Sequence, residues 1–169
     1  MDELIDVVNE KDEILYSVSK KEAHDKGLLH RTVVAMIRDT GKRFVLVKQA
    51  SDRQDPGQYV SPVGGHVQAS ESEEEAIKRE ALEEMGIADF KFRLLGKAIF
   101  NREVFNRKEN HYFIYYEIYN DGPYTVNEES VSFKAFTETE LKKLIEENPE
   151  MFGAAFHFVV QKFFPQLLT

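Results

Sequence analysis

The sequence contains no cysteine among its 169 residues. This absence excludes disulfides, a cysteine nucleophile and thiolate metal sites. The sequence also has no apolar run near the roughly 20 residues that a membrane-spanning helix needs, so we expect no membrane partner. Its N-terminus, MDELIDVVNEKDEILYS, lacks the basic then apolar order of a secretory signal. These absences together predict a cytoplasmic protein.

Clusters of lysine and arginine are missing as well, and the formal net charge is −8. Nucleic-acid backbones are bound by clustered basic side chains. The sequence therefore predicts no nucleic-acid partner. An anionic substrate would need cations to bridge the repulsion between it and the protein.

The length predicts one domain over residues 1–169, which is enough chain to bury its own core. Hydrophobic residues make up 42% of the chain and charged residues 31%, as in globular proteins. Repeats, low-complexity stretches and linkers are absent from the sequence. No pattern in it predicts an oligomeric state.

Six runs are typical of strands because they are rich in β-branched or aromatic residues. They are LIDVVN, ILYSVS, RTVVAMIR, RFVLVKQ, FKFRLLGKAIF and HYFIYYEIY. DTGK between the third and fourth runs predicts a hairpin turn. The sixth run is apolar at nearly every position, which predicts a central strand. The loop DPGQYVSPVGG contains at most a short strand.

Helix signals lie between and after these strands. SKKEAHDKG predicts a short helix between Ser19 and Gly27. Thr137 and Glu140 form a capping box for ETELKKLIEE. Asn148, followed by proline, predicts the N-cap of a last helix, which would carry the buried residues Phe152, Phe156, Val159, Val160 and Phe163. The order of elements predicts an α/β or α+β domain with a mixed sheet between helices.

The stretch GGHVQASESEEEAIKREALEEMGI carries seven glutamates between residues 71 and 84. Ser70 and Glu73 form a capping box that predicts a helix from about Glu71, and Gly86 is well placed to end it. Apolar and acidic residues then occupy different sides of the helix. The apolar side holds Ile77, Ala81, Leu82 and Met85, and the acidic side holds Glu80, Glu83 and Glu84.

The three late glutamates are unfavourable by themselves. Like charges one turn apart cost a few tenths of a kcal/mol per pair, and the helix dipole disfavours anions in the last turn. Two interpretations are open. The carboxylates form a solvated face, or they surround a hard divalent cation such as Mg²⁺, which prefers oxygen ligands.

The spacing from Gly65 to Ile87 resembles a complete Nudix box, G-x5-E-x7-R-E-U-x-E-E-x-G-U, in which U is a bulky aliphatic residue. Its single soft departure is Ala81. The resemblance favours a cation, and it implies a mixed sheet between helices and hydrolysis of a diphosphate in a nucleotide or nucleoside diphosphate derivative, with Mg²⁺ or Mn²⁺. By position, the implied metal ligands are Glu80, Glu83, Glu84 and the carbonyl of Gly65.

The resemblance also implies roles for neighbouring residues. Arg79 would orient carboxylates, above all Glu71. Glu80 or Glu83 is the first choice for the general base. Glu128 and Glu129, in the later segment NEES, are further candidates.

Three segments outside the box, EAHDKGLLHR, DPGQYVSPVGGH and ENHYF, resemble the isopentenyl-diphosphate isomerase branch of Nudix proteins. The metal ligands of that isomerase fall at His24, His30, His66 and Glu109. Its catalytic cysteine falls at Gly64, and the glutamate that serves as its acid/base falls at His111. Without these two groups, double-bond migration lacks its proton-transfer partners.

The sequence therefore predicts an isomerase-like Nudix hydrolase. The alternatives are an isopentenyl-diphosphate isomerase and a non-catalytic nucleotide-binding module. Several residue roles also have two interpretations. Lys48 and Arg53 contact a phosphate or are ordinary surface cations, and Tyr59 stacks on a base or packs internally. A last group of residues either binds a second metal ion or consists of ordinary hydrogen-bonded residues. This group is His24, His30, His66, Glu109 and His111.

Overall fold

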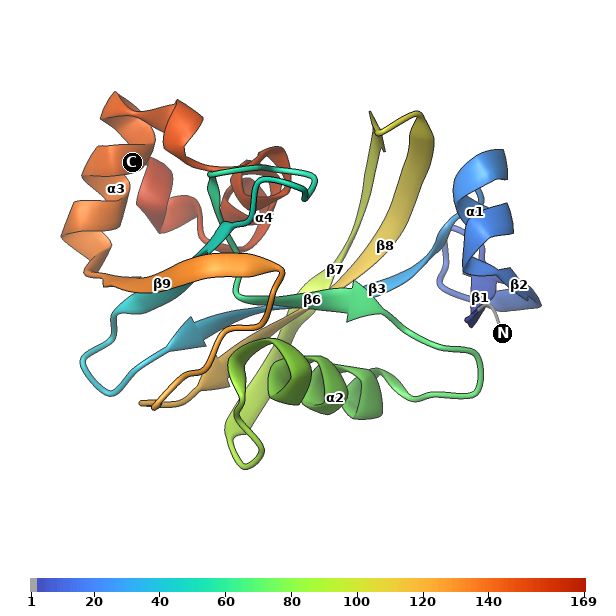
Figure 1. Cartoon of the computed structure of the whole chain (residues 1–169), viewed down its shortest axis with the longest axis horizontal. Coiled ribbons are helices and arrows are strands. Elements are labelled where there is room, and N and C mark those ends of the chain that lie inside the picture. Colours follow the sequence, from blue (N-terminus) through green and yellow to red (C-terminus); the bar gives the residue numbers. More distant parts are fainter. Residues whose placement is uncertain (1–2) are drawn as a thin grey trace.

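The computed structural model describes residues 3–169 and contains one mixed sheet with helices on both faces (Figure 1). The strands are β1 (Leu4–Val8), β2 (Ile14–Ser19), β3 (His30–Arg38), β4 (Phe44–Gln49), β5 (Tyr59–Val60), β6 (Val63–His66), β7 (Lys91–Val104), β8 (Arg107–Tyr119) and β9 (Ser130–Phe136). The α-helices are α1 (Lys20–Lys26), α2 (Glu73–Met85), α3 (Glu138–Glu147) and α4 (Ala154–Phe163), with short 3-10 helices at Pro149–Met151 and Pro165–Leu168.

Strand β3 organises the sheet. It pairs in parallel with β8 along its whole length, and antiparallel with β4 and β6. Strand β8 also pairs antiparallel with β7, so the predicted central strand is confirmed. The predicted hairpin between β3 and β4 is confirmed too, because Ile37 lies opposite Val45.

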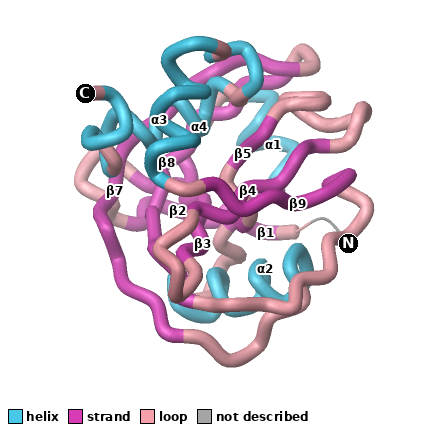
Figure 2. Tube along the Cα trace, turned by 90° about the vertical axis from the view of Figure 1, so that its left-hand side faces the viewer, coloured by secondary structure: helices cyan, strands magenta, loops and turns pink. Residues whose placement is uncertain are grey.

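Alternation along β3 creates a core on each face of the sheet. Val33, Ala35 and Ile37 belong to the cluster that includes the apolar side of α2. Met36 belongs to a second cluster with residues of α3 and α4. Figure 2 shows the strands lying between α2 on one side and α3 and α4 on the other. The predicted mixed sheet between helices is confirmed. Among the described residues, no helix has the length and apolar character needed to cross a membrane.

The start of α2 differs from the prediction. The capping box uses Ser72 and Glu75, and the helix begins at Glu73. Ser70 instead has a positive φ of 70° in the turn before the helix. The run SESEEE offers two overlapping serine–glutamate pairs at the same spacing, so the pattern alone does not select between them. The predicted end at Gly86 is confirmed.

Further expectations at element ends and surfaces are corrected, and one strand was missed. Leu82 is 54% exposed and does not join the apolar side of α2. Asn148 makes no side-chain cap and precedes a 3-10 turn, and α4 starts only after Gly153. Phe152 is therefore buried ahead of the helix and not in it, and Phe163 is only half-buried. Strand β9 was not predicted. Its apolar residues Val131 and Phe133 are exposed on an edge strand, so they give no core signal.

The hairpin of β7 and β8 extends beyond the sheet toward the helix α1 (Figure 1). Its two-residue turn is Phe105–Asn106, and both residues have positive φ. Such a turn keeps the strong twist of the two strands and fixes their register. Arg102 therefore lies opposite Glu109 near the tip of the hairpin.

The capping assignment can be tested with two alanine variants. Ser72→Ala should lower the free energy of unfolding by about 1 kcal/mol, because the backbone N–H of Glu75 loses its acceptor. Ser70→Ala should change it by less than about 0.5 kcal/mol. Urea unfolding measures both. A larger loss from Ser70→Ala than from Ser72→Ala would show that Ser70 is the N-cap.

Candidate active site and metal centre

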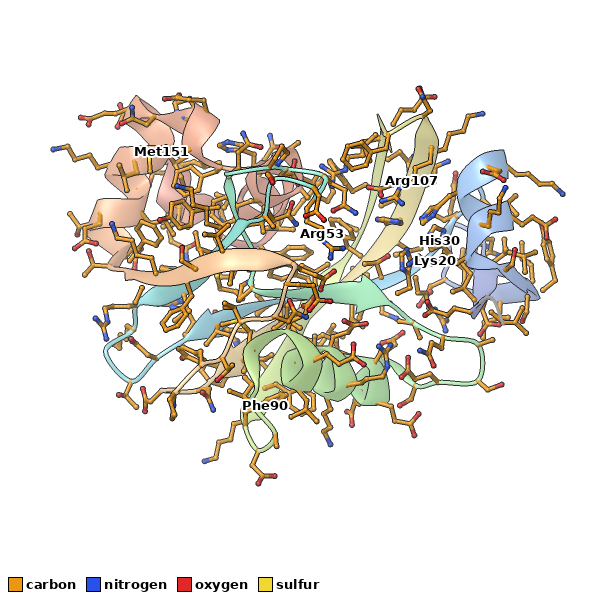
Figure 3. All side chains as sticks on the ribbon, in the orientation of Figure 1. Lys20, His30, Arg53, Phe90, Arg107 and Met151 are labelled. Atoms are coloured by element: carbon orange, nitrogen blue, oxygen red, sulfur yellow. The ribbon has the colours of Figure 1, made fainter. Side chains whose placement is uncertain are left out.

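A cavity of about 530 Å³ lies where β6, α2, the β7–β8 hairpin and α4 approach one another. One end is acidic and is lined by Glu80, Glu83, Glu84 and Glu129. The other end carries imidazoles and cations. In Figure 3, Arg53 lies near the middle of the molecule, whereas Lys20, His30 and Arg107 lie toward α1 and the hairpin. Residues lining this second end include Lys20, His66, Arg102, Arg107 and His111.

Arg79 is the hub of the acidic end. Its guanidinium donates to both carboxylate oxygens of Glu71, at 2.7 and 3.0 Å, and to Glu80 at 2.6 Å. It also donates to the backbone carbonyl of His66 at 3.0 Å. The expected pairing of Arg79 with Glu71 is therefore present. Because these contacts use most of its donors, Arg79 fixes the start of α2 against the end of β6.

Two glycines of β6 bring backbone against the carboxylates. The N–H of Gly64 donates to Glu84 at 2.7 Å. A Cβ at Gly65 would overlap the carboxylate of Glu80. The glycine pair therefore lets α2 approach the strand closely enough for its late glutamates to enter the cavity.

The acidic end concentrates more negative charge than its surroundings neutralise. Burial raises the pKa of Glu80 to about 7, although the Arg79 guanidinium acts in the opposite direction. Burial and the nearby carboxylates of Glu80 and Glu129 raise the pKa of Glu84 well above its usual range. Buried carboxylates that repel one another suit a hard divalent cation, which supplies the missing positive charge. The residues present therefore fit the implied metal.

Glu129 joins this group from the loop before β9. Arg53 lies 3.3 Å from one of its carboxylate oxygens, and the side-chain carbonyl of Asn127 accepts from its backbone N–H. Glu128, the other candidate from the same segment, is exposed and does not line the cavity. The strand β9, absent from the prediction, is the element that places Glu129.

Four histidines meet at the other end, one each from α1, β3, β6 and β8. They are His24, His30, His66 and His111, and one ligand atom of each lies within 4.8 Å of the others. Burial lowers the pKa of all four, that of His30 to about 4, so the imidazoles are neutral at pH 7. Neutral imidazoles have the lone pairs that metal ions bind.

Glu109 is close to this cluster but is not among its converging atoms. Arg102 and Arg107 donate to its two carboxylate oxygens, and Arg102 also contacts Asp55. Sequence reasoning missed both arginines and Asp55. The arginines meet Glu109 because of the register of the β7–β8 hairpin. The turn residues Phe105–Asn106 are not typical of a two-residue hairpin turn, so the sequence does not reveal that register.

Lys48 and Tyr59 do not line the cavity. Alternation along β4 turns Val47 and Gln49 toward it and Lys48 away. The Tyr59 ring packs edge-on against Phe136 at 5.3 Å between centroids. These positions do not support the predicted substrate contacts of Lys48 and Tyr59, whereas Arg53 does line the cavity.

Comparison of the sequence with known protein families identifies one match. The family described as NUDIX domain matches residues 28–155. The chain belongs to the Nudix family. The prediction of a hydrolase that acts on pyrophosphate bonds is thereby confirmed at the level of the Nudix class.

Two relatives match most of the chain. An isopentenyl-diphosphate Delta-isomerase of Aliivibrio fischeri strain MJ11 is 31% identical and covers 96% of this chain and 95% of its own. The uncharacterized Nudix hydrolase YfcD of Escherichia coli K12 is 30% identical, covering 77% of this chain and 71% of its own. The crystal structure of DR0079 from Deinococcus radiodurans, 23% identical, shares the fold with a TM-score of 0.72 over 94% of this chain and 98% of its own.

The close approach at β6 predicts different costs for two alanine variants. Gly65→Ala should destabilise the protein by about 1–3 kcal/mol, because the new methyl group displaces the Glu80 carboxylate. Gly64→Ala should cost less, since the nearest atom to its Cβ lies 3.8 Å away. Thermal unfolding compares them. Equal costs would show that Glu80 moves aside freely.

The raised pKa of Glu80 predicts a pH-dependent cost to stability. Its folded pKa of about 7 exceeds its ordinary value of 4.5, so ionisation destabilises the folded state increasingly from pH 4.5 to 7. In metal-free protein at pH 8, Glu80→Gln should therefore raise the free energy of unfolding by on the order of 2–3 kcal/mol. The gain should disappear near pH 4.

Urea unfolding of metal-free protein at both pH values provides the measurement. Glu74→Gln is the matched control, because Glu74 is exposed in the first turn of the same helix. A similar gain from both variants at pH 8 would point to general charge reduction and would contradict the burial of Glu80 as the cause.

Proposed function

We propose that the protein is a pyrophosphohydrolase that depends on Mg²⁺ or Mn²⁺ and cleaves a diphosphate linkage in a nucleotide or nucleoside diphosphate derivative. One observation carries this proposal. The buried carboxylates of Glu80 and Glu84 lie against the backbone of two glycines, with Arg79 holding the first of them. Two buried carboxylates so close together destabilise a protein unless a cation binds between them.

In this proposal, Glu80, Glu83, Glu84 and the Gly65 carbonyl hold the cation. Arg79 and Glu71 position these ligands. When bound, the cation screens the diphosphate, lowers the pKa of water and stabilises charge on the leaving phosphate oxygen. The proton of the attacking water passes to Glu80, Glu83 or Glu129. Glu129 is favoured by its separate loop and by Arg53, which orients its carboxylate.

Phosphate groups of the substrate would lie toward the cations of the cavity. Arg53 is well suited to contact them, because it lines the cavity and its Nε, 3.7 Å from a carboxylate oxygen of Asp52, makes no hydrogen bond among residues 3–169. Lys20 also lines the cavity and supplies a further positive charge. Arg53, one of the predicted contacts, and Lys20 are therefore the proposed substrate contacts, and Lys48 and Tyr59 are not.

The isomerase alternative is less well supported by the same site. Gly64 has no side chain where the isomerase has its cysteine, and its N–H is already bonded to Glu84. His111 lies in the histidine cluster, where the isomerase has a glutamate. A non-catalytic module is also disfavoured, because every carboxylate of the box is retained.

The histidine cluster forms, in our proposal, a second metal site. Four buried imidazole nitrogens, the Nε2 atoms of His24, His30, His66 and His111, have no hydrogen-bond partner among residues 3–169. An unsatisfied buried polar atom costs about 1–3 kcal/mol. Four such atoms at one point favour a shared ligand over ordinary structural histidines.

A substrate screen scored by product identity tests the main proposal. The purified protein, supplied with Mg²⁺ or Mn²⁺, should cleave at least one diphosphate derivative to products that phosphorus NMR identifies. Formation of dimethylallyl from isopentenyl diphosphate would establish the isomerase instead. Tight nucleotide binding without turnover in either metal would establish the binding module.

The metal assignment predicts a large effect at Glu84. Glu84→Gln should lower kcat by about 100-fold or more, because removing one carboxylate ligand costs several kcal/mol of transition-state stabilisation. Circular dichroism should show an intact fold. Glu74→Gln, on the exposed face of the same helix, provides the matched control. Full activity of Glu84→Gln would contradict the metal assignment.

A further inference from the structure

We infer that the histidine cluster binds one borderline transition ion, of which Zn²⁺ is the best match, through four imidazoles only, and that Arg102 and Arg107 withhold Glu109 from that ion. This inference rests on the second metal site proposed above and specifies its ligands and its metal class. It departs from the ligand set implied by the resemblance to the isomerase, in which a glutamate at the position of Glu109 binds the metal.

The four imidazoles already surround a common point. Their ring centroids lie 4.7–6.0 Å apart in all six pairs. One ligand atom of each residue lies within 4.8 Å of the other three. A tetrahedral zinc site with bonds of about 2.0–2.1 Å separates its nitrogens by about 3.3 Å. A small inward movement of the rings would therefore complete the tetrahedron.

The surroundings also fix the orientation of one ring. Nδ1 of His30 lies 2.8 Å from the backbone carbonyl of Leu28, which can only accept a hydrogen bond. Nδ1 therefore carries the proton, and Nε2 is left with a lone pair in the centre of the cluster. Proteins usually orient a metal-binding histidine in this way, through a hydrogen bond from the ring nitrogen that does not bind the metal.

Glu109 is held in a different direction by an ion-pair network. Arg102 donates to one carboxylate oxygen at 3.2 Å. Arg107 contacts the other oxygen through two nitrogens, at 3.1 and 2.9 Å. Arg102 is itself fixed from the opposite side by both carboxylate oxygens of Asp55, at 3.1 and 3.2 Å.

This network makes Glu109 a poor ligand. Its side chain is only 3% exposed, so water cannot replace the two arginines if the carboxylate turns toward an ion. Turning toward the ion would separate this buried carboxylate from both arginines, and the loss of its ion-pair partners is unfavourable. Arg102 and Arg107 are therefore positioning residues, and the ligand set of the cluster is four imidazoles.

The ligand set determines the class of metal. Mg²⁺ and Mn²⁺ prefer carboxylate, carbonyl and water oxygens, whereas imidazole suits Zn²⁺ and its neighbours. A tetrahedral site with four protein ligands also leaves no open position, as in structural zinc sites. The two ends of the cavity are thus built for different ions, a hard ion at the carboxylates and a borderline ion at the imidazoles.

Metal retention in the full chain tests this inference. Protein stripped with a chelator is reloaded with Zn²⁺ in the presence of excess Mg²⁺, desalted, and assayed for both metals. The wild type should retain one zinc and no magnesium at the cluster. Glu84→Gln should retain the same zinc, because its substitution lies at the other end of the cavity.

Variants at the cluster separate its ligands from its neighbours. His111→Gln should weaken zinc binding by at least about tenfold, as expected when a metal-ligand contact is lost. Glu109→Gln should retain zinc like the wild type, since Glu109 is not a ligand. His157→Gln is the matched control, because His157 lies on α4, away from the cluster, and its ring Nε2 bonds to the carbonyl of Pro149.

Cobalt substitution provides a second measurement, whose main result comes from the wild type alone. Co²⁺ bound by four imidazoles should give the intense visible absorption of a tetrahedral ion, and Glu109→Gln should leave that spectrum unchanged. Weak absorption typical of six ligands would overturn the inference. So would equal losses of zinc from Glu109→Gln and His111→Gln, or a wild type that retains no zinc.

These outcomes differ from those of the proposed hydrolysis. A protein that hydrolyses its substrate with Mg²⁺ but retains no zinc overturns only the metal site inferred here. A protein that retains zinc through four imidazoles but releases no phosphate product from any substrate overturns only the proposed function.

Discussion

The acidic end of the cavity depends on one guanidinium. Arg79 contacts Glu71, Glu80 and the carbonyl of His66, so a single side chain joins the loop before α2, the helix itself and the end of β6. Without that positive charge, the buried carboxylates would repel one another, and the close packing of α2 against β6 would be destabilised. The glycines of β6 permit the approach, and Arg79 stabilises it.

The same short strand serves both ends of the cavity. Gly64 and Gly65 present backbone to the carboxylates, and the next residue, His66, turns its imidazole to the histidine cluster. Its carbonyl accepts from Arg79. Three consecutive residues therefore link two chemically different environments, and a change in the register of β6 against β3 would disturb both together.

How far the sequence predicted this structure depends on the range of the interactions. The box motif and the strand pattern are local, so they indicated the sheet, the end of α2 and the pairing of Arg79 with Glu71. The exact start of α2 was not predictable, because Ser70 and Ser72 offer equivalent caps. The pairing of Arg102 with Glu109 depends on an unusual turn, and the apolar residues Val131 and Phe133 of β9 are exposed. Such features arise from tertiary contacts.

The histidine cluster joins segments that are remote in the chain. His24 lies on α1, whereas His111 lies on β8 beyond the whole acidic helix. An ion bound by both would act as a cross-link and would restrict the unfolded chain much as a disulfide does, with the entropic benefit growing with the length of the closed loop. In a chain without cysteine, such a cross-link would reinforce the pairing of β1 with β3, which already joins the N-terminal segment to the sheet.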